Sequence, residues 1–82
     1  MIKDMAMDKA YFVPTHRYSL NAGIPAEILG VVLATPTGLE QRLCYHLRWA
    51  DGREDWTPVH DTKTYEIIGF NDILKGNIPK IK

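Results

Sequence analysis

The chain has 82 residues, enough for one small domain and too few for two independent cores. Ten basic and ten acidic residues give a formal net charge of zero, so the chain lacks the basic excess that most nucleic-acid-binding proteins need. A single cysteine excludes an internal disulfide and fits a reducing compartment. No apolar run approaches the roughly 20 residues of a membrane span. We therefore expect a cytoplasmic domain without a membrane segment.

The N-terminal quarter of the chain predicts one strand and a weakly structured start. Residues 1–10 have apolar side chains near helical spacing, and they are predicted to form a tail or a short peripheral helix. Residues 11–14 are apolar and end in a proline, which cannot donate to a strand ladder. Residues 15–20 have mild strand character, and turn residues follow at 21–25. The folded domain is expected to begin at residue 11.

The most apolar segment, 26–35, is predicted to be a bent strand. Val31 and Val32 favour extended backbone, and Gly30 beside them suits a tight bend. Turn residues at 36–38 close this strand.

The strongest local signal in the sequence is Asp51-Gly52, which predicts a hairpin between two strands within 42–61. Along the first of these strands apolar residues alternate with polar ones, so one face should be apolar and aromatic and the other charged. The apolar set is Leu43, Tyr45, Leu47 and Trp49.

The length of the hairpin loop decides which residues face each other. A two-residue loop places Arg48 opposite Asp55 and Arg42 opposite Asp61, as two exposed ion pairs. On the other face it places Leu47 against Trp56. A four-residue loop keeps the same faces but loses both pairs, with Trp49 and Trp56 then opposite each other. A three-residue loop turns Trp56 to the charged face, which the alternating pattern disfavours.

The C-terminal part predicts one more strand and a single helical turn. The strand covers 65–68, and the helical turn covers 73–75, with Asn71 or Asp72 as its cap and Gly76 as its end. Residues 76–82 read as an extended, weakly basic tail. About five short strands with turns between them predict an all-β barrel or sandwich that covers residues 11–75.

A family resemblance supports this fold class. A bent strand at 26–32, a strand and acidic-Gly turn at 45–52, an acidic–aromatic–x–Pro run at 55–58 and a short strand at 65–68 occur in that order. In this order, residues 26–68 resemble SH3-like barrels of the Tudor and chromo-barrel kind. The resemblance implies a five-stranded barrel with a short helical turn near the C-terminus, and a binding module rather than an enzyme. Tudor-type domains often bind methylated lysine or arginine in an aromatic cage, and related barrels bind nucleic acid or other proteins.

No catalytic site, cofactor or metal is expected. Cys44 and His46 lie two residues apart on one strand, about 6.6 Å along it, which exceeds the hydrogen-bond reach of a nucleophile and its base. A zinc site from these two residues with His16 and His60 lacks a second closely spaced ligand pair, and strand parity places His60 on the opposite face. The acidic residues lie beside arginines and an exposed turn, where nothing raises a carboxyl pKa for acid–base work.

The leading hypothesis is a binding module that recognises a protein or peptide through an aromatic rim on the hairpin. The competing interpretation is that the aromatic residues only fill the core. The aromatic candidates for the rim are Trp49, Trp56, Tyr45 and Tyr65. The acidic candidates that would set its charge preference are Asp51, Glu54 and Asp55.

Two other hypotheses remain open at this point. The first is nucleic-acid binding through arginines of the hairpin and lysines of the C-terminal part, which are Arg42, Arg48, Arg53, Lys75, Lys80 and Lys82. The second is a structural assembly subunit that pairs through an exposed edge of the barrel.

Overall fold

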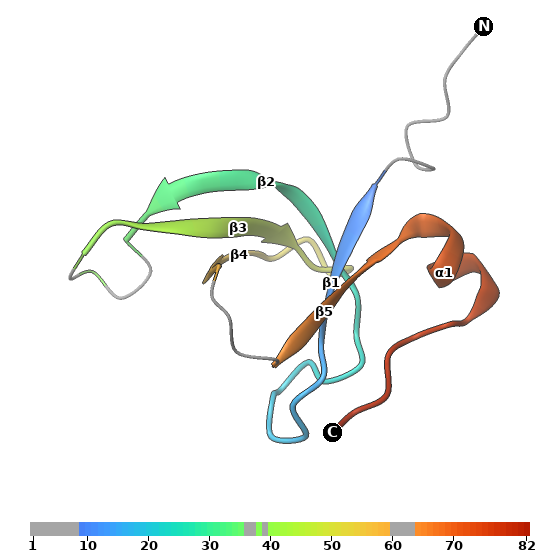
Figure 1. The fold of residues 1–82 in the computed structure, drawn as a ribbon. Helices are drawn as coiled ribbons and strands as arrows, with labels where there is room; N and C mark the ends of the chain where they lie inside the picture. Colours follow the sequence, from blue (N-terminus) through green and yellow to red (C-terminus); the bar gives the residue numbers. More distant parts are fainter. Residues whose placement is uncertain (1–8, 36–37, 39, 60–63) are drawn as a thin grey trace, which may run out of the picture.

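The structure is a computed structural model that describes residues 9–35, 38, 40–59 and 64–82. Within these residues the chain forms five strands in one antiparallel sheet, followed by a short helix (Figure 1). This confirms the all-β fold class. The elements are β1 (Ala10–Pro14), β2 (Ala26–Ala34), β3 (Arg42–Arg48), β4 (Glu54–Pro58), β5 (Tyr65–Gly69) and α1 (Phe70–Lys75). No helix in the described part of the chain has the length and apolar character needed to cross a membrane.

The strand order in the sheet is β4-β3-β2-β1-β5. The first four strands pair with their neighbours in sequence, and β5 returns to the free side of β1, where Ala10 pairs with Gly69 and Pro14 with Tyr65. The sheet is open, because β4 and β5 form its two edges and no pairing between their described residues closes a barrel.

The long strand β2 bends in its middle, as the sequence predicts. Its register against β3 shifts between Ile28 and Gly30, so Leu29 is an extra residue in a β-bulge. Before the bulge, Ala26 and Glu27 pair with β1, whereas β3 pairs with β2 from Glu27 to Ala34. The bend therefore directs the second half of β2 away from β1 (Figure 1).

The first strand lies earlier in the chain than predicted. It is β1, and Pro14 is its last residue, where a missing N–H removes no interior ladder bond. The predicted strand at 15–20 is wrong, because turns occupy residues 17–23 and the side chains of Tyr18 and Leu20 are exposed. One of these turns is closed by the N–H of Ser19, which donates to the carbonyl of His16. The predicted N-terminal helix lies outside the described residues apart from 9 and 10, and Ala10 begins β1.

The main cluster of buried residues lies on one face of the sheet, which we call the inner face. Its buried residues are Phe12, Ala26, Leu47 and Trp49, with Ile28, Tyr45 and Tyr65 packed against them. The rings of Phe12 and Tyr65 stack at a centroid distance of 4.5 Å. Each large side chain buried here stabilises the fold by about 1.5–3 kcal/mol. The opposite face, which carries Glu27, Arg48 and Trp56, is called the outer face.

The helix α1 ends as the sequence predicts and begins differently. Gly76 adopts a left-handed conformation, and its N–H and that of Asn77 bond carbonyls of the last turn, as in a Schellman motif. Asn71 and Asp72 do not cap the helix, because both lie inside it and Gly69 precedes its first residue.

The tail after α1 is tied to the loop that follows β1. The N–H of Lys82 donates to the carbonyl of Thr15 at 2.6 Å, and the N–H of Arg17 donates to the carbonyl of Lys82 at 3.1 Å.

Candidate functional site

The turn between β3 and β4 has three residues, Ala50, Asp51 and Gly52. The N–H of Trp49 donates to the carbonyl of Arg53 at 2.8 Å, and the N–H of Gly52 donates back to the carbonyl of Trp49 at 2.9 Å. Gly52 has a φ of 91°, which suits the left-handed position that ends a three-residue hairpin loop. The carboxylate of Asp51 accepts the N–H of Arg53 and holds the turn closed.

This turn corrects the predicted register of the hairpin. Arg48 pairs with Glu54 and His46 with Trp56, so neither the two-residue nor the four-residue loop is formed. Trp56 therefore lies on the outer face, which the sequence pattern disfavoured. A contact on the inner face explains this register. The buried indole N–H of Trp49 needs an acceptor, and the three-residue turn places the carboxylate of Asp55 2.9 Å from it.

The predicted cross-strand ion pairs are replaced by others. Arg48 does not face Asp55; its guanidinium bonds Glu27 on β2 at 2.9 Å. Arg42 bonds Glu40 at 3.0 Å, while its predicted partner Asp61 lies outside the described residues.

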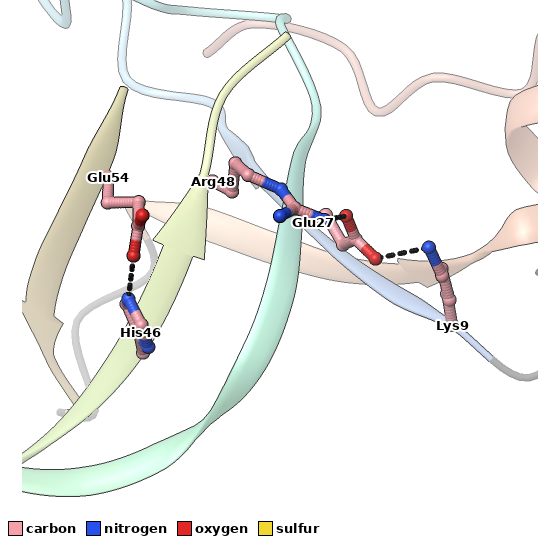
Figure 2. A network of polar contacts seen from close by, with 5 residues as sticks. All are labelled: Lys9, Glu27, His46, Arg48 and Glu54. Carbon is pink, nitrogen blue, oxygen red and sulfur yellow. Dashed lines mark hydrogen bonds and ion pairs between the residues drawn. The ribbon is translucent and has the colours of Figure 1, made fainter. Parts of the chain in front are cut away.

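Glu27 is the centre of a polar network on the outer face. One of its carboxylate oxygens contacts the Lys9 ammonium at 2.5 Å, and the other accepts a hydrogen bond from Arg48 (Figure 2). Only 17% of its side chain is exposed. The hydrogen bond from Lys9, and then that from Arg48, hold the pKa of Glu27 below its ordinary value of 4.5. The network therefore neutralises Arg48 within the molecule.

Trp56 and His46 form a stacked aromatic pair on the same face. Their ring centroids are 4.7 Å apart and their planes differ by 8°. The separation matches the spacing of about 4.7–4.9 Å between neighbouring strands, so the rings stand side by side on β4 and β3. The imidazole is also held by Glu54, whose carboxylate lies 2.5 Å from Nε2 (Figure 2). Trp56 remains 45% exposed.

No side chain of β2 lies beside His46 on the side away from Trp56. The residue paired with His46 on β2 is Gly30, which has no side chain. A Cβ added to Gly30 would meet no atom within 4 Å. The row across β4, β3 and β2 therefore consists of Trp56, His46 and the open space above Gly30, which we call the vacant position.

The structure separates the four aromatic residues of the predicted rim. Trp49 is only 7% exposed and belongs to the core. Tyr45 and Tyr65 are half-buried on the inner face, with their rings edge to face at 5.8 Å. Burial, and then the hydrogen bond with Tyr65, raise the pKa of Tyr45 above its ordinary value. Of these four residues, Trp56 alone presents a large exposed surface.

The three acidic candidates lie in different surroundings. Glu54 is beside the aromatic stack, whereas Asp55 bonds the indole of Trp49 on the inner face. Asp51 lies in the turn, where hydrogen bonds from the backbone and then the side chain of Arg53 lower its pKa. Of the three, Glu54 is the one whose carboxylate contacts the His46–Trp56 pair, through the imidazole. The sequence did not single out His46 and Gly30 as partners in this site, because only the cross-strand register brings them together.

Cys44 is a buried structural residue. It is fully buried, and its Sγ lies 3.5 Å from the carbonyl of Arg42, to which the thiol donates. Within the described part of the chain, no cluster of three or more His, Cys, Asp or Glu residues is placed to hold a metal ion.

Comparisons with protein-family models, curated proteins and solved structures found no match.

Proposed function

We propose that the protein is a non-catalytic binding module that recognises a protein or peptide through the His46–Trp56 pair. The observation that carries this proposal is the exposure of Trp56, whose ring stacks on His46 on the outer face. Large, pre-ordered aromatic side chains supply contact area at low cost in conformational entropy, and they dominate the energy of many protein interfaces.

We propose further that the fold is an opened SH3-like barrel. Five short antiparallel strands, a β2 strand bent at Leu29 and a short helix after β5 support this assignment. In this proposal Tyr45 and Tyr65 contribute to the core beside Phe12 rather than to a cage for a methylated ligand.

A protein partner is favoured over nucleic acid because the arginines of the hairpin are already paired with carboxylates. Arg42, Arg48 and Arg53 each bond a carboxylate of the chain itself. A phosphate would have to compete with these carboxylates, and an arginine that is already neutralised releases few counterions on binding.

The chemistry of the vacant position favours a neutral aromatic side chain of the partner. A flat ring above Gly30 would stack on the free side of His46 at the same spacing as Trp56. The charges around it already have partners, because Glu54 contacts His46 and Arg48 bonds Glu27. A charged ligand group would therefore find no complementary charge there that is not already paired.

Peptide selection followed by calorimetry tests this proposal. Peptides are selected on the immobilised protein from a random library, and the best binders are titrated into the wild type, Trp56→Ala and Gly30→Val. We expect selected peptides with an aromatic residue in common, and a loss of affinity of about tenfold or more in both variants. Gly30→Val is informative because it fills the vacant position where the structure has room.

Tyr18→Ala is the matched control, because Tyr18 is 80% exposed and lies in the turn after β1. It should bind the selected peptides like the wild type. Selection of the same peptides by Trp56→Ala would overturn the proposal. So would tight oligonucleotide binding that weakens steeply with added salt, which would favour the nucleic-acid alternative.

A further inference from the structure

The second half of β2 has the composition of an interior strand and the exposure of a surface one. Val31, Val32 and Leu33 are consecutive, so they place apolar side chains on both faces of the sheet. Such runs are typical of strands that are covered on both sides. Here the exposed fractions are 51%, 38% and 62%.

One backbone edge of this segment has no partner strand among the described residues. β1 pairs with β2 only at Ala26 and Glu27, and beyond the bulge the described strands pair with β2 on the β3 side alone. Figure 1 shows β2 and β3 continuing together away from β1. Within the part of the chain that the structure describes, the edge from Gly30 to Ala34 is therefore free.

The alternation of an antiparallel ladder shows which groups point outward from this edge. The N–H of Val59 donates to the carbonyl of Leu43, so Leu43 directs its backbone groups toward β4. The next residue, Cys44, must direct its groups toward β2, and its partner Val32 directs its own toward β3.

It follows that the residues on either side of Val32 direct their N–H and C=O groups toward the free edge. These residues are Val31 and Leu33. Two donors and two acceptors on an apolar strand form a ready template for another strand.

We infer that this edge pairs with the same edge of a second copy of the chain. The two β2 strands would run antiparallel about a two-fold axis at Val32. Val31 of each copy would then exchange backbone hydrogen bonds with Leu33 of the other, and the two Val32 side chains would meet at the axis. The pairing would join two open sheets into one and place apolar side chains of the two copies beside one another on both faces.

The chemistry of the edge favours a second copy over a different partner. The segment from Gly30 to Ala34 contains no charge and no proline, so two identical edges meet without repulsion. The nearest charged residue on β2 is Glu27, which lies before the bulge and is paired with Lys9 and Arg48. Edge strands that must stay unpaired usually contain charges, proline or an outward bulge.

The opposite edge of the sheet has this protection. The edge strand β4 is short, begins with Glu54 and Asp55 and ends with Pro58. The segment of β2 from Gly30 to Ala34 lacks the charges and the proline that protect β4, which favours this segment over β4 as the edge that pairs.

Sedimentation velocity on the full chain tests the inference. Over a rising concentration series, we expect the wild type to approach twice the single-chain mass of 9.4 kDa. Val32→Glu brings two like charges together at the axis, so its dissociation constant should rise by about tenfold or more. Leu74→Glu is the matched control, because Leu74 is an exposed apolar residue on α1, and this variant should dimerise like the wild type.

Amide hydrogen exchange on the wild type is an independent test. It needs no substitution, so a folding defect in a variant cannot affect its result. Exchange at Val31 and Leu33 should slow as the concentration rises, because their N–H groups become bonded in the dimer. A wild type with the mass of one chain at every concentration would overturn the inference. A dimer in which both amides exchange at an unchanged rate would also overturn it, because such a dimer would use another surface.

Discussion

The two tryptophans of the central hairpin lie on opposite faces of the sheet and differ in almost every physical respect. Trp49 is 7% exposed, packs in the core and donates its indole N–H to Asp55. Trp56 is 45% exposed and rests on His46 among charged side chains. The residue type is the same, so the difference comes from the three-residue turn, which sets the face that each strand position occupies.

The largest expected effect is that of Trp49→Ala. It removes a buried aromatic side chain and leaves Asp55 without the indole N–H, so we expect a loss of about 3–5 kcal/mol in the free energy of unfolding. Urea denaturation followed by circular dichroism measures this loss. A loss below about 1 kcal/mol would contradict the assignment of Trp49 to the core.

The second prediction concerns the turn that separates the two faces. Gly52 has a φ of 91°, so Gly52→Ala forces a side chain into a strained conformation and should cost about 1–2 kcal/mol. Thermal and urea unfolding measure this cost. Gly30→Ala is the control: Gly30 lies in open space without a positive φ, so this change should be neutral or should stabilise by about 0.4–1 kcal/mol. Equal losses in both variants would count against the turn geometry.

The third prediction tests whether the ion pairs of Glu27 on the outer face contribute to the free energy of unfolding. Glu27→Gln removes two ion pairs that contribute about 0.2–1 kcal/mol each, so the loss at neutral pH should be about 1 kcal/mol. Because the pKa of Glu27 is lowered on folding, the unfolded chain binds its proton first as the pH falls. The stabilisation by the Glu27 carboxylate is therefore complete well above pH 4.5 and is lost below it.

Urea unfolding of both proteins from neutral to acid pH measures this dependence. The curves for the wild type and Glu27→Gln should differ at neutral pH and converge as the pH falls through the lowered pKa of Glu27. Parallel curves over the whole range would show that Glu27 has no such role.

The smallest expected effect on stability is that of Trp56→Ala. Trp56 is half-exposed at an edge strand and its main ring contact is His46, so the loss should stay below about 1 kcal/mol. Comparison with Trp49→Ala under the same conditions measures the contrast between the two faces directly. Equal losses in the two variants would mean that both tryptophans belong to the core.

Much of the fold is predictable from local pattern, and the register is not. The all-β class, the bend at Gly30, the position of the hairpin and the end of the helix at Gly76 follow from short-range chemistry, and the structure confirms them. The Asp51-Gly52 pair predicts a turn but does not set its length. That length depends on contacts between the aligned strands, such as the hydrogen bond from the indole of Trp49 to Asp55.

The candidate site depends on the same register, which is why only part of it was predictable. The sequence indicates Trp56 and Glu54 as an aromatic and an acidic residue near a turn. His46 and Gly30 join them only after three strands are aligned, and no pattern within one strand indicates that alignment.

The pairing of β5 with β1 has a consequence for the order in which the chain folds. Ala10 pairs with Gly69, 59 residues later (69 − 10), whereas β2, β3 and β4 are joined by local hairpins. Closing the long loop costs entropy before its contacts form, so the three-stranded meander should assemble first. During synthesis, β1 leaves the ribosome first among the strands and completes its pairing last, so its apolar side chains would be available to chaperones throughout that interval.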